Sequence, residues 1–118
     1  MKDEIYKIRV DYITDVVIPM NLKVGDIVKL GEEAKEDKWK GWIYATKDSI
    51  EGYVPMQIIE LLADKNYGKI KEDYTAKEIS VKTGDDIIKI KCLNGWAWVR
   101  KESEEGWIPE EVIEYKNV

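Results

Sequence analysis

The sequence contains no histidine and only one cysteine, Cys92, among its 118 residues. Histidine is the commonest general base and the commonest ligand for transition metals, so its absence disfavours most catalytic and metal sites. One cysteine cannot form an internal disulfide, and no basic cluster lies near Cys92 in the sequence to activate its thiol. The sequence therefore predicts a protein that is not an enzyme and holds no cofactor or metal.

Long apolar runs are also missing. No segment approaches the roughly 20 apolar residues that a membrane span requires, and the N-terminus has no apolar stretch of signal-peptide length. The apolar content of 44% is typical of a globular chain. We therefore expect a cytoplasmic protein that does not associate with membranes.

Basic residues are outnumbered by acidic ones. The chain has 19 Lys and Arg against 24 Asp and Glu, which gives a formal net charge of −5. This balance is a poor match to a phosphate backbone, so binding to nucleic acid is disfavoured. The acidic pair Asp85 and Asp86 follows a glycine and has no second acidic cluster at a ligand spacing, so it indicates a turn rather than a metal site.

The sequence contains an internal repeat. Residues 52–60 match residues 106–114, and residues 41–45 match residues 95–99 at the same offset of 54. Upstream, the offset grows to 59 between Gly25 and Gly84 and to 62 between two Asp-Tyr pairs at residues 11–12 and 73–74. Length differences between matched blocks are what loops between strands tolerate. We predict two domains, at residues 4–62 and 67–117, joined by a short polar linker at residues 63–66.

The local pattern indicates strands throughout. Short runs of β-branched and aromatic residues alternate with Gly, Asp, Asn and Lys clusters, and no segment keeps a helical period. Residues 56–61 could hold one 3₁₀ turn before a last strand. The predicted fold class is all-β, with two small β-barrels in tandem.

Two hairpins can be placed in register. If residues 46–51 form the connection, Trp42 lies opposite Pro55, and Tyr44 lies opposite Tyr53. The second repeat pairs Trp96 with Pro109 and Trp98 with Trp107. Alternation then sends small and branched residues to the core: Ile43, Ala45, Val54, Ala97, Val99 and Ile108. The aromatic row is predicted to face solvent, where its apolar area calls for a partner.

One position breaks the alignment of the repeats. Counted from the glycine, Leu30 of the first repeat corresponds to Lys89 of the second. Either the strand of the second repeat carries a bulge that shifts its register by one residue, or the alignment slips there; we favour the bulge.

The order of these blocks resembles the SH3 domain family. That family runs from an Ala-Leu-Tyr-Asp-Tyr segment through a long loop, called the RT loop, to Gly-Asp, then to a Trp pair and a Gly-x-x-Pro ending. The first repeat has residues 8–12 (Ile-Arg-Val-Asp-Tyr), Gly25-Asp26, Trp42 and residues 52–55 (Gly-Tyr-Val-Pro). The second repeat has residues 70–74 (Ile-Lys-Glu-Asp-Tyr), Gly84-Asp85, Trp96 and residues 106–109 (Gly-Trp-Ile-Pro).

The resemblance implies two five-stranded SH3-like barrels whose aromatic grooves bind Pro-rich segments in the polyproline II conformation. Its groove positions fall on Tyr12, Trp42 and Pro55 in the first repeat and on Tyr74, Trp96 and Pro109 in the second. The acidic positions of the RT loop, which pair with a ligand Arg or Lys, fall on Asp15 and Glu78. Two other groove tyrosines of the family are replaced, by Val10 and Ile58 in the first repeat and by Glu72 and Val112 in the second.

The sequence thus predicts a non-catalytic module that binds a protein or an extended peptide, with Pro-rich and basic segments as candidate ligands. The alternative is a structural or self-associating subunit whose aromatic faces are sealed between the barrels or between chains. A cell-wall-binding module would need export, and a nucleic-acid-binding barrel would need a basic surface.

Overall fold

The computed structural model describes residues 4–16, 18–36 and 40–115. It confirms the all-β prediction: the described residues form two five-stranded sheets, one two-stranded sheet and two short 3₁₀ turns. Neither five-stranded sheet is closed into a barrel by hydrogen bonding among these residues. In the described part of the chain, no helix is long and apolar enough to cross a membrane.

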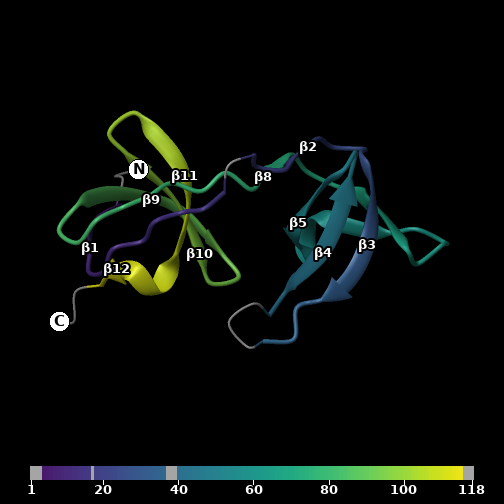
Figure 1. Cartoon of the computed structure of the whole chain (residues 1–118), viewed down its shortest axis with the longest axis horizontal. Coiled ribbons are helices and arrows are strands. Elements are labelled where there is room, and N and C mark those ends of the chain that lie inside the picture. Colours follow the sequence, from purple (N-terminus) through teal and green to yellow (C-terminus); the bar gives the residue numbers. More distant parts are fainter. Residues whose placement is uncertain (1–3, 17, 37–39, 116–118) are drawn as a thin grey trace. The chain divides into compact units, whose positions relative to one another are not determined.

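The chain divides into two compact units, unit 1 with residues 1–17 and 77–118, and unit 2 with residues 18–76. The sheet of unit 1 has the strand order β11-β10-β9-β1-β12 and that of unit 2 the order β5-β4-β3-β7-β6 (Figure 1). The strands of unit 1 are β1 (Glu4–Ile8), β9 (Asp86–Leu93), β10 (Trp96–Lys101), β11 (Glu104–Pro109) and β12 (Ile113–Glu114). Those of unit 2 are β2 (Asn21–Leu22), β3 (Ile27–Glu33), β4 (Trp42–Lys47), β5 (Ile50–Pro55), β6 (Ile59–Leu61), β7 (Tyr67–Ile70) and β8 (Tyr74–Thr75).

This division differs from the predicted boundaries, because the repeats exchange their first strands. Strand β1, from the first repeat, pairs with β9 and β12 of the second repeat. Strand β7, from the second repeat, pairs with β3 and β6 of the first. In Figure 1 the purple β1 lies among the green and yellow strands of unit 1. Each unit therefore contains residues of both repeats.

Matched hydrogen bonds fix the two exchanged strands in equivalent places. In unit 1 the amide of Ile8 donates to Asp85 at 2.9 Å and its carbonyl accepts from Gly84 at 2.7 Å. In unit 2 Ile70 makes the same two bonds, to the carbonyl of Asp26 at 2.8 Å and from the amide of Gly25 at 2.8 Å. Gly25 and Gly84 have φ of +93° and +91°, which residues with a side chain rarely adopt, so both turns depend on glycine.

The predicted linker is a hairpin loop. Residues 62–66 connect β6 to β7, which are neighbouring antiparallel strands of unit 2. The amide of Leu62 donates to the carbonyl of Tyr67 at 3.1 Å, and the amide of Asn66 donates to the Asp64 side chain at 3.0 Å. The chain passes between the units at residues 17–18 and 76–77 instead.

Each unit has its own apolar core. In unit 1 the core contains Ile8, Ile79, Val81, Ile87, Ala97, Val99, Ile108, Val112 and Ile113. In unit 2 it contains Met20, Leu22, Val28, Ala45, Val54, Ile58, Ile59 and Ile70, with Ile43 partly buried against it. The predicted core face of both hairpins is confirmed. Ile8 and Ile70 each reach the core of the unit that their exchanged strand joins.

Of two further local predictions, the 3₁₀ turn is confirmed and the bulge is present at a different place. The 3₁₀ turn predicted before the last strand is present at Met56–Ile58, and its counterpart lies at Glu110–Val112. A bulge is present in β9: the pairing with β10 shifts register between Trp98 and Val99, which face Lys91 and Lys89, so Ile90 is the extra residue. It lies beyond Lys89, which faces Val99 as Leu30 faces the equivalent Ala45, so the bulge does not explain the charge at the place of Leu30. Unit 2 has its own shift, in β3 between Leu30 and Glu33.

Candidate functional site

The aromatic row forms as predicted on both hairpins. Trp42 lies opposite Pro55 and Tyr44 opposite Tyr53 between β4 and β5, and the two tyrosine rings meet edge to face at 5.3 Å. Between β10 and β11 the corresponding pairs are Trp96 with Pro109 and Trp98 with Trp107, whose rings are also 5.3 Å apart.

Most of this row is covered. The exposed fraction is 4% for Trp42, 9% for Trp96 and 4% for Trp107, so the prediction that these side chains face solvent is wrong. Pro55 is also buried, whereas Tyr53 is 40% exposed. Because Ala45 and Ala97 occupy the core faces of their strands, alternation places the indoles of Trp42 and Trp96 on the opposite faces.

The burial of Trp107 has a visible cause in unit 1. The segment at residues 77–79 runs along β11: the amide of Trp107 donates to the carbonyl of Lys77 at 2.8 Å, and Glu78 forms a parallel bridge with Trp107. Lys91 places its ammonium 5.7 Å from the centre of the Trp107 ring. This side of the hairpin is therefore covered by the chain itself.

Unit 1 brings together four of the predicted ligand-binding residues. The ring of Tyr12 meets Trp96 edge to face at 6.2 Å, and Pro109 lies opposite Trp96 in the sheet. The hydroxyl of Tyr12 donates to the carboxylate of Glu78, which also accepts from the hydroxyl of Thr14 at 2.9 Å. Burial, followed by the contact with Glu78, raises the pKa of Tyr12 well above its usual value. Glu78 thus anchors the segment that carries Tyr12.

The remaining predicted residues are distributed differently from the repeats. Tyr12 belongs to the first repeat, yet it lies beside Trp96 of the second because it follows β1 into unit 1. Tyr74 of the second repeat lies in unit 2, where it packs on the core. Asp15 is exposed in unit 1. Trp42 and Pro55 therefore share a unit with Tyr74, and Trp96 and Pro109 share one with Tyr12.

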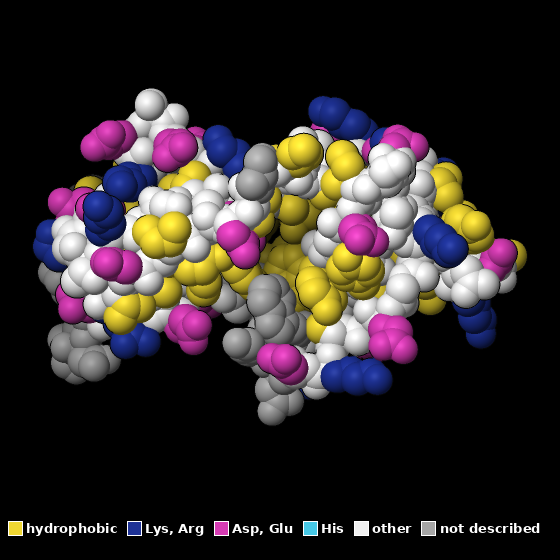
Figure 2. Space-filling model, in the orientation of Figure 1, with side chains coloured by type: hydrophobic (Ala, Val, Ile, Leu, Met, Phe, Trp, Pro, Cys, Tyr) yellow, Lys and Arg dark blue, Asp and Glu magenta, His cyan; other side chains and the backbone are white. Residues whose placement is uncertain are grey.

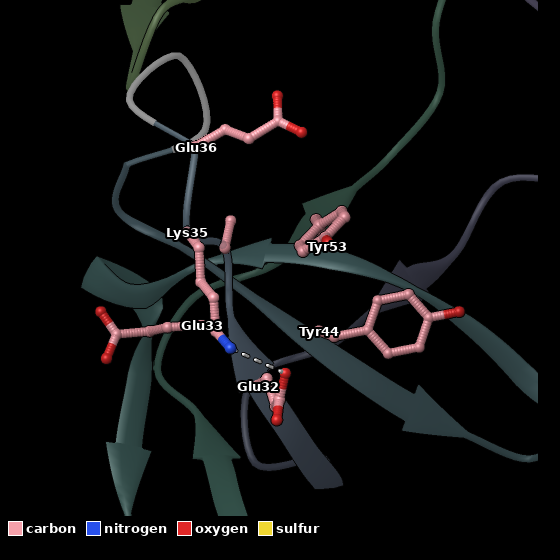
Figure 3. Close-up of a pocket in the computed structure, with 7 residues that line it drawn as sticks. Glu32, Glu33, Lys35, Glu36, Tyr44 and Tyr53 are labelled. Carbon is pink, nitrogen blue, oxygen red and sulfur yellow. Dashed lines mark ion pairs between the residues drawn. The ribbon is translucent and has the colours of Figure 1, made fainter.

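An acidic groove lies next to the Trp42 and Pro55 pair in unit 2. Tyr44 and Tyr53 are the next cross-strand pair on the same face of β4 and β5. The groove has a volume of about 490 Å³, and its lining consists of Glu32, Glu33, Ala34, Lys35, Glu36, Tyr44 and Tyr53. Figure 3 shows Glu36 extending toward the side on which the tyrosine rings lie, whereas Glu33 points away from them.

The electrostatics of this groove favour a cation. Three carboxylates line it against one ammonium, that of Lys35, which lies 3.8 Å from Glu32 with both side chains highly exposed. Such an exposed pair is worth little energy, so an incoming cation can compete for Glu32. Burial, then the nearby Glu51, raises the pKa of Tyr44, which keeps its ring neutral.

Sequence reasoning did not identify this groove as a site. It places Tyr44 and Tyr53 in the aromatic row but does not connect them with the carboxylates of residues 32–36. The available signal is Gly31, because a glycine inside a strand often marks a bulge or a close approach. A Cβ on Gly31 would lie 3.4 Å from the Cβ of Tyr44, and the register of β3 shifts just after Leu30. Trp39, in the same loop, lies outside the described residues.

A second polar cluster lies in unit 1 around Lys89. Its ammonium is 5.4 Å from the ring centre of Tyr6 and 4.8 Å from that of Tyr115, and 3.9 Å from Glu110. Tyr115 donates its hydroxyl to Glu110 at 2.8 Å, and burial raises the pKa of this hydroxyl to about 12. Burial also raises the pKa of the Cys92 thiol, which lies 3.2 Å from Glu110. This cluster is satisfied internally and offers no activated nucleophile.

Among residues 4–16, 18–36 and 40–115, no group of three or more acidic or cysteine side chains is placed to hold a metal ion. Comparison with known proteins assigns no family. The chain matches no protein-family model, and no curated protein is significantly similar to it.

Proposed function

We propose that the protein is a non-catalytic cytoplasmic binding module, with two SH3-like units, that recognises a basic, extended segment of a protein partner. The observation that carries this proposal is the groove of unit 2, where Tyr44 and Tyr53 lie among Glu32, Glu33 and Glu36. A Lys or Arg side chain over a tyrosine face gains cation–π attraction, and the carboxylates add Coulomb attraction.

The groove continues the predicted ligand surface. Tyr44 and Tyr53 are the next pair along the hairpin from the covered Trp42 and Pro55, so a ligand on this face would contact the tyrosine pair, of which Tyr53 is the more exposed. In unit 1 the equivalent face contains Tyr12, Trp96 and Pro109, with Glu78 beside Tyr12. An extended segment that reached both faces would gain avidity without any further contact.

The charge distribution supports a polypeptide ligand rather than a nucleic acid. On the face shown in Figure 2, Lys and Arg side chains lie interspersed with Asp and Glu over both units, without a broad basic patch among the described residues. Nucleic-acid binding requires a basic surface that tracks phosphates.

The first test uses Tyr53→Ala and a fluorescein-labelled peptide of alternating lysine and proline residues. Removing the exposed ring should weaken peptide binding about tenfold, or 1.4 kcal/mol, as measured by fluorescence anisotropy. Binding should also weaken with added salt, because exposed charges are screened.

Tyr67→Ala is the matched control. Tyr67 is 39% exposed, nearly the same as Tyr53 at 40%, and it lies in unit 2 outside the groove. It should leave the affinity unchanged. Equal losses in the two variants, or no loss in Tyr53→Ala, would reject the groove as the binding site.

The burial of the indoles favours a second candidate function, a structural subunit that uses no groove. Trp42, Trp96 and Trp107 are each at most 9% exposed, as expected if the aromatic faces are sealed. This function predicts no binding of the basic peptide and strong protection of tryptophan fluorescence against acrylamide.

A further inference from the structure

Strand β1 is held entirely by residues near the other end of the chain. Its register runs from Glu4 opposite Lys89 to Lys7 opposite Asp86 on one side. On the other side, Lys7 lies opposite Glu114 and Ile8 opposite Ile113. Ile8 is 2% exposed and belongs to the core of unit 1. β1 is therefore an inner strand of a sheet whose other strands begin at residue 86.

The segment that follows β1 is anchored in the same unit. We call residues 4–16 the N-terminal arm. Asp11 accepts from the amide of Thr83 at 2.7 Å, Tyr12 bridges to Val81, and the amide of Thr14 donates to the hydroxyl of Ser80 at 3.1 Å. The arm thus belongs to unit 1 along its described length, and its covalent continuation passes into unit 2 at residues 17–18.

The sequence at this connection favours an extended chain. Val16 and Ile18 are β-branched, Ile18 precedes Pro19, and no Gly, Asn or Asp occurs between Val16 and Met20. β-branched residues and residues before proline prefer extended backbone, and the structure has a bend at Ile18, next to Pro19.

In this chain, each five-stranded sheet is completed by a strand from the other repeat. β7 of the second repeat occupies the same place in unit 2 that β1 of the first repeat occupies in unit 1. Both places therefore accept a strand that does not come from the same repeat.

We propose that two copies of the chain exchange their N-terminal arms, so that β1 of each copy pairs with β9 and β12 of the other. Tyr12 of one copy then lies against Trp96 of the other and completes that face. The exchange preserves every contact of the arm and changes only the connection. The role of Tyr12 in ligand binding rests on the proposed function, whereas the exchange of arms between copies does not.

The protein concentration decides whether the arm pairs within its own copy or with the other copy. Within one copy the arm has an effective concentration on the order of 1 mM, the value typical of short flexible tethers. The exchanged dimer should therefore be rare in dilute protein and abundant near that concentration. Exchange requires the arm to leave unit 1, so it should be slow.

The test mixes two single-cysteine variants, Lys7→Cys and Glu114→Cys, each with Cys92→Ser. Directly opposite residues of antiparallel strands have Cα atoms about 4.5–5.5 Å apart, within the reach of a disulfide. After long incubation at about 1 mM followed by dilution and oxidation, we expect a disulfide-linked heterodimer on a non-reducing gel.

Glu60→Cys provides the matched control for Glu114→Cys. Glu60 lies opposite Lys69 in unit 2, as Glu114 lies opposite Lys7 in unit 1. Mixed with Lys7→Cys, it should give about tenfold less heterodimer, because exchange at about 1 mM does not bring β1 to that strand. Equal yields from both mixtures, or no heterodimer from the first, would overturn the exchange.

The contribution of Tyr12 is tested by complementation. A Tyr12→Ala chain and a Trp96→Ala chain each lack one side of the face, but an exchanged dimer of the two assembles one intact copy. With Tyr53→Ala in both chains to weaken the groove of unit 2, the mixture at high concentration should regain binding of the lysine-proline peptide that each variant has lost. Pro109→Ala replaces Trp96→Ala if circular dichroism shows that the latter is unfolded. Failure to regain binding while the heterodimer forms would overturn the role of Tyr12.

Discussion

Gly52 and Gly106 occupy equivalent places in the two repeats but meet different surroundings. A Cβ on Gly106 would lie 2.8 Å from the side chain of Ile79 and 3.1 Å from backbone atoms of Glu78 and Ile79. A Cβ on Gly52 would meet nothing within 4 Å. The segment that covers Trp107 and carries Glu78 therefore depends on the glycine at position 106.

Gly106→Ala should lower the free energy of unfolding by about 1–3 kcal/mol, because backbone must shift to admit the methyl group. Gly52→Ala should change it by less than about 0.5 kcal/mol. Chemical denaturation monitored by tryptophan fluorescence measures both. Equal effects would contradict the packing of residues 78–79 on β11.

Asp11 and Asp85 make unit 1 sensitive to acid. The amide of Thr83 lowers the pKa of Asp11, and that of Lys82 lowers the pKa of Asp85, in each case by bonding the charged form. Groups with a lowered pKa stabilise the fold above their unfolded pKa of 3.8, and this contribution is lost as the pH falls through the folded value.

The variant Asp11→Asn should therefore have a lower melting temperature than the parent chain at pH 7. The difference should shrink as the pH falls below about 4, because the parent then loses the same charge. Melting curves by circular dichroism between pH 7 and 2 test this, and a difference that stays constant over the range would contradict it.

At the scale of elements, the pairing within each hairpin was predictable from the sequence, and the exchange of β1 and β7 between the repeats was not. The opposition of Trp42 to Pro55 follows from a short hairpin and alternation, which the sequence contains. β1 and β7, by contrast, have nearly the same pattern, and each ends in an isoleucine that fits either core. Sequence similarity therefore cannot say which sheet each strand joins. The pairing of Tyr12 with Trp96 was missed for the same reason.

The variants Ile8→Ala and Ile70→Ala test which of the two sheets β1 and β7 each join. Each removes a side chain that is at most 2% exposed, at a cost of about 2–5 kcal/mol. Ile8→Ala should speed hydrogen exchange in β9 and β12 while β3 and β6 stay protected, and Ile70→Ala should do the reverse. Loss of protection in β3 and β6 on Ile8→Ala would place β1 in its own repeat.

At the scale of the whole molecule, the exchange of β1 and β7 between the repeats makes the two repeats depend on each other. A unit of about 60 residues buries only about 60% of its unfolded surface and is marginally stable. Here neither sheet is complete without a strand from the other repeat, so the chain cannot form one repeat and leave the other unfolded. Both faces of the proposed binding surface depend on this arrangement, because Tyr12 and Tyr74 each reach their unit through it.

The strand exchange between the two repeats of one chain is measured most directly by an intramolecular disulfide in dilute protein that carries Cys92→Ser. We expect the Lys7→Cys, Glu114→Cys double variant to form it within one chain on oxidation, because these residues lie opposite each other in unit 1. The Lys7→Cys, Glu60→Cys double variant should stay reduced. Closure of the second variant instead of the first would show that β1 pairs within its own repeat and would contradict the account.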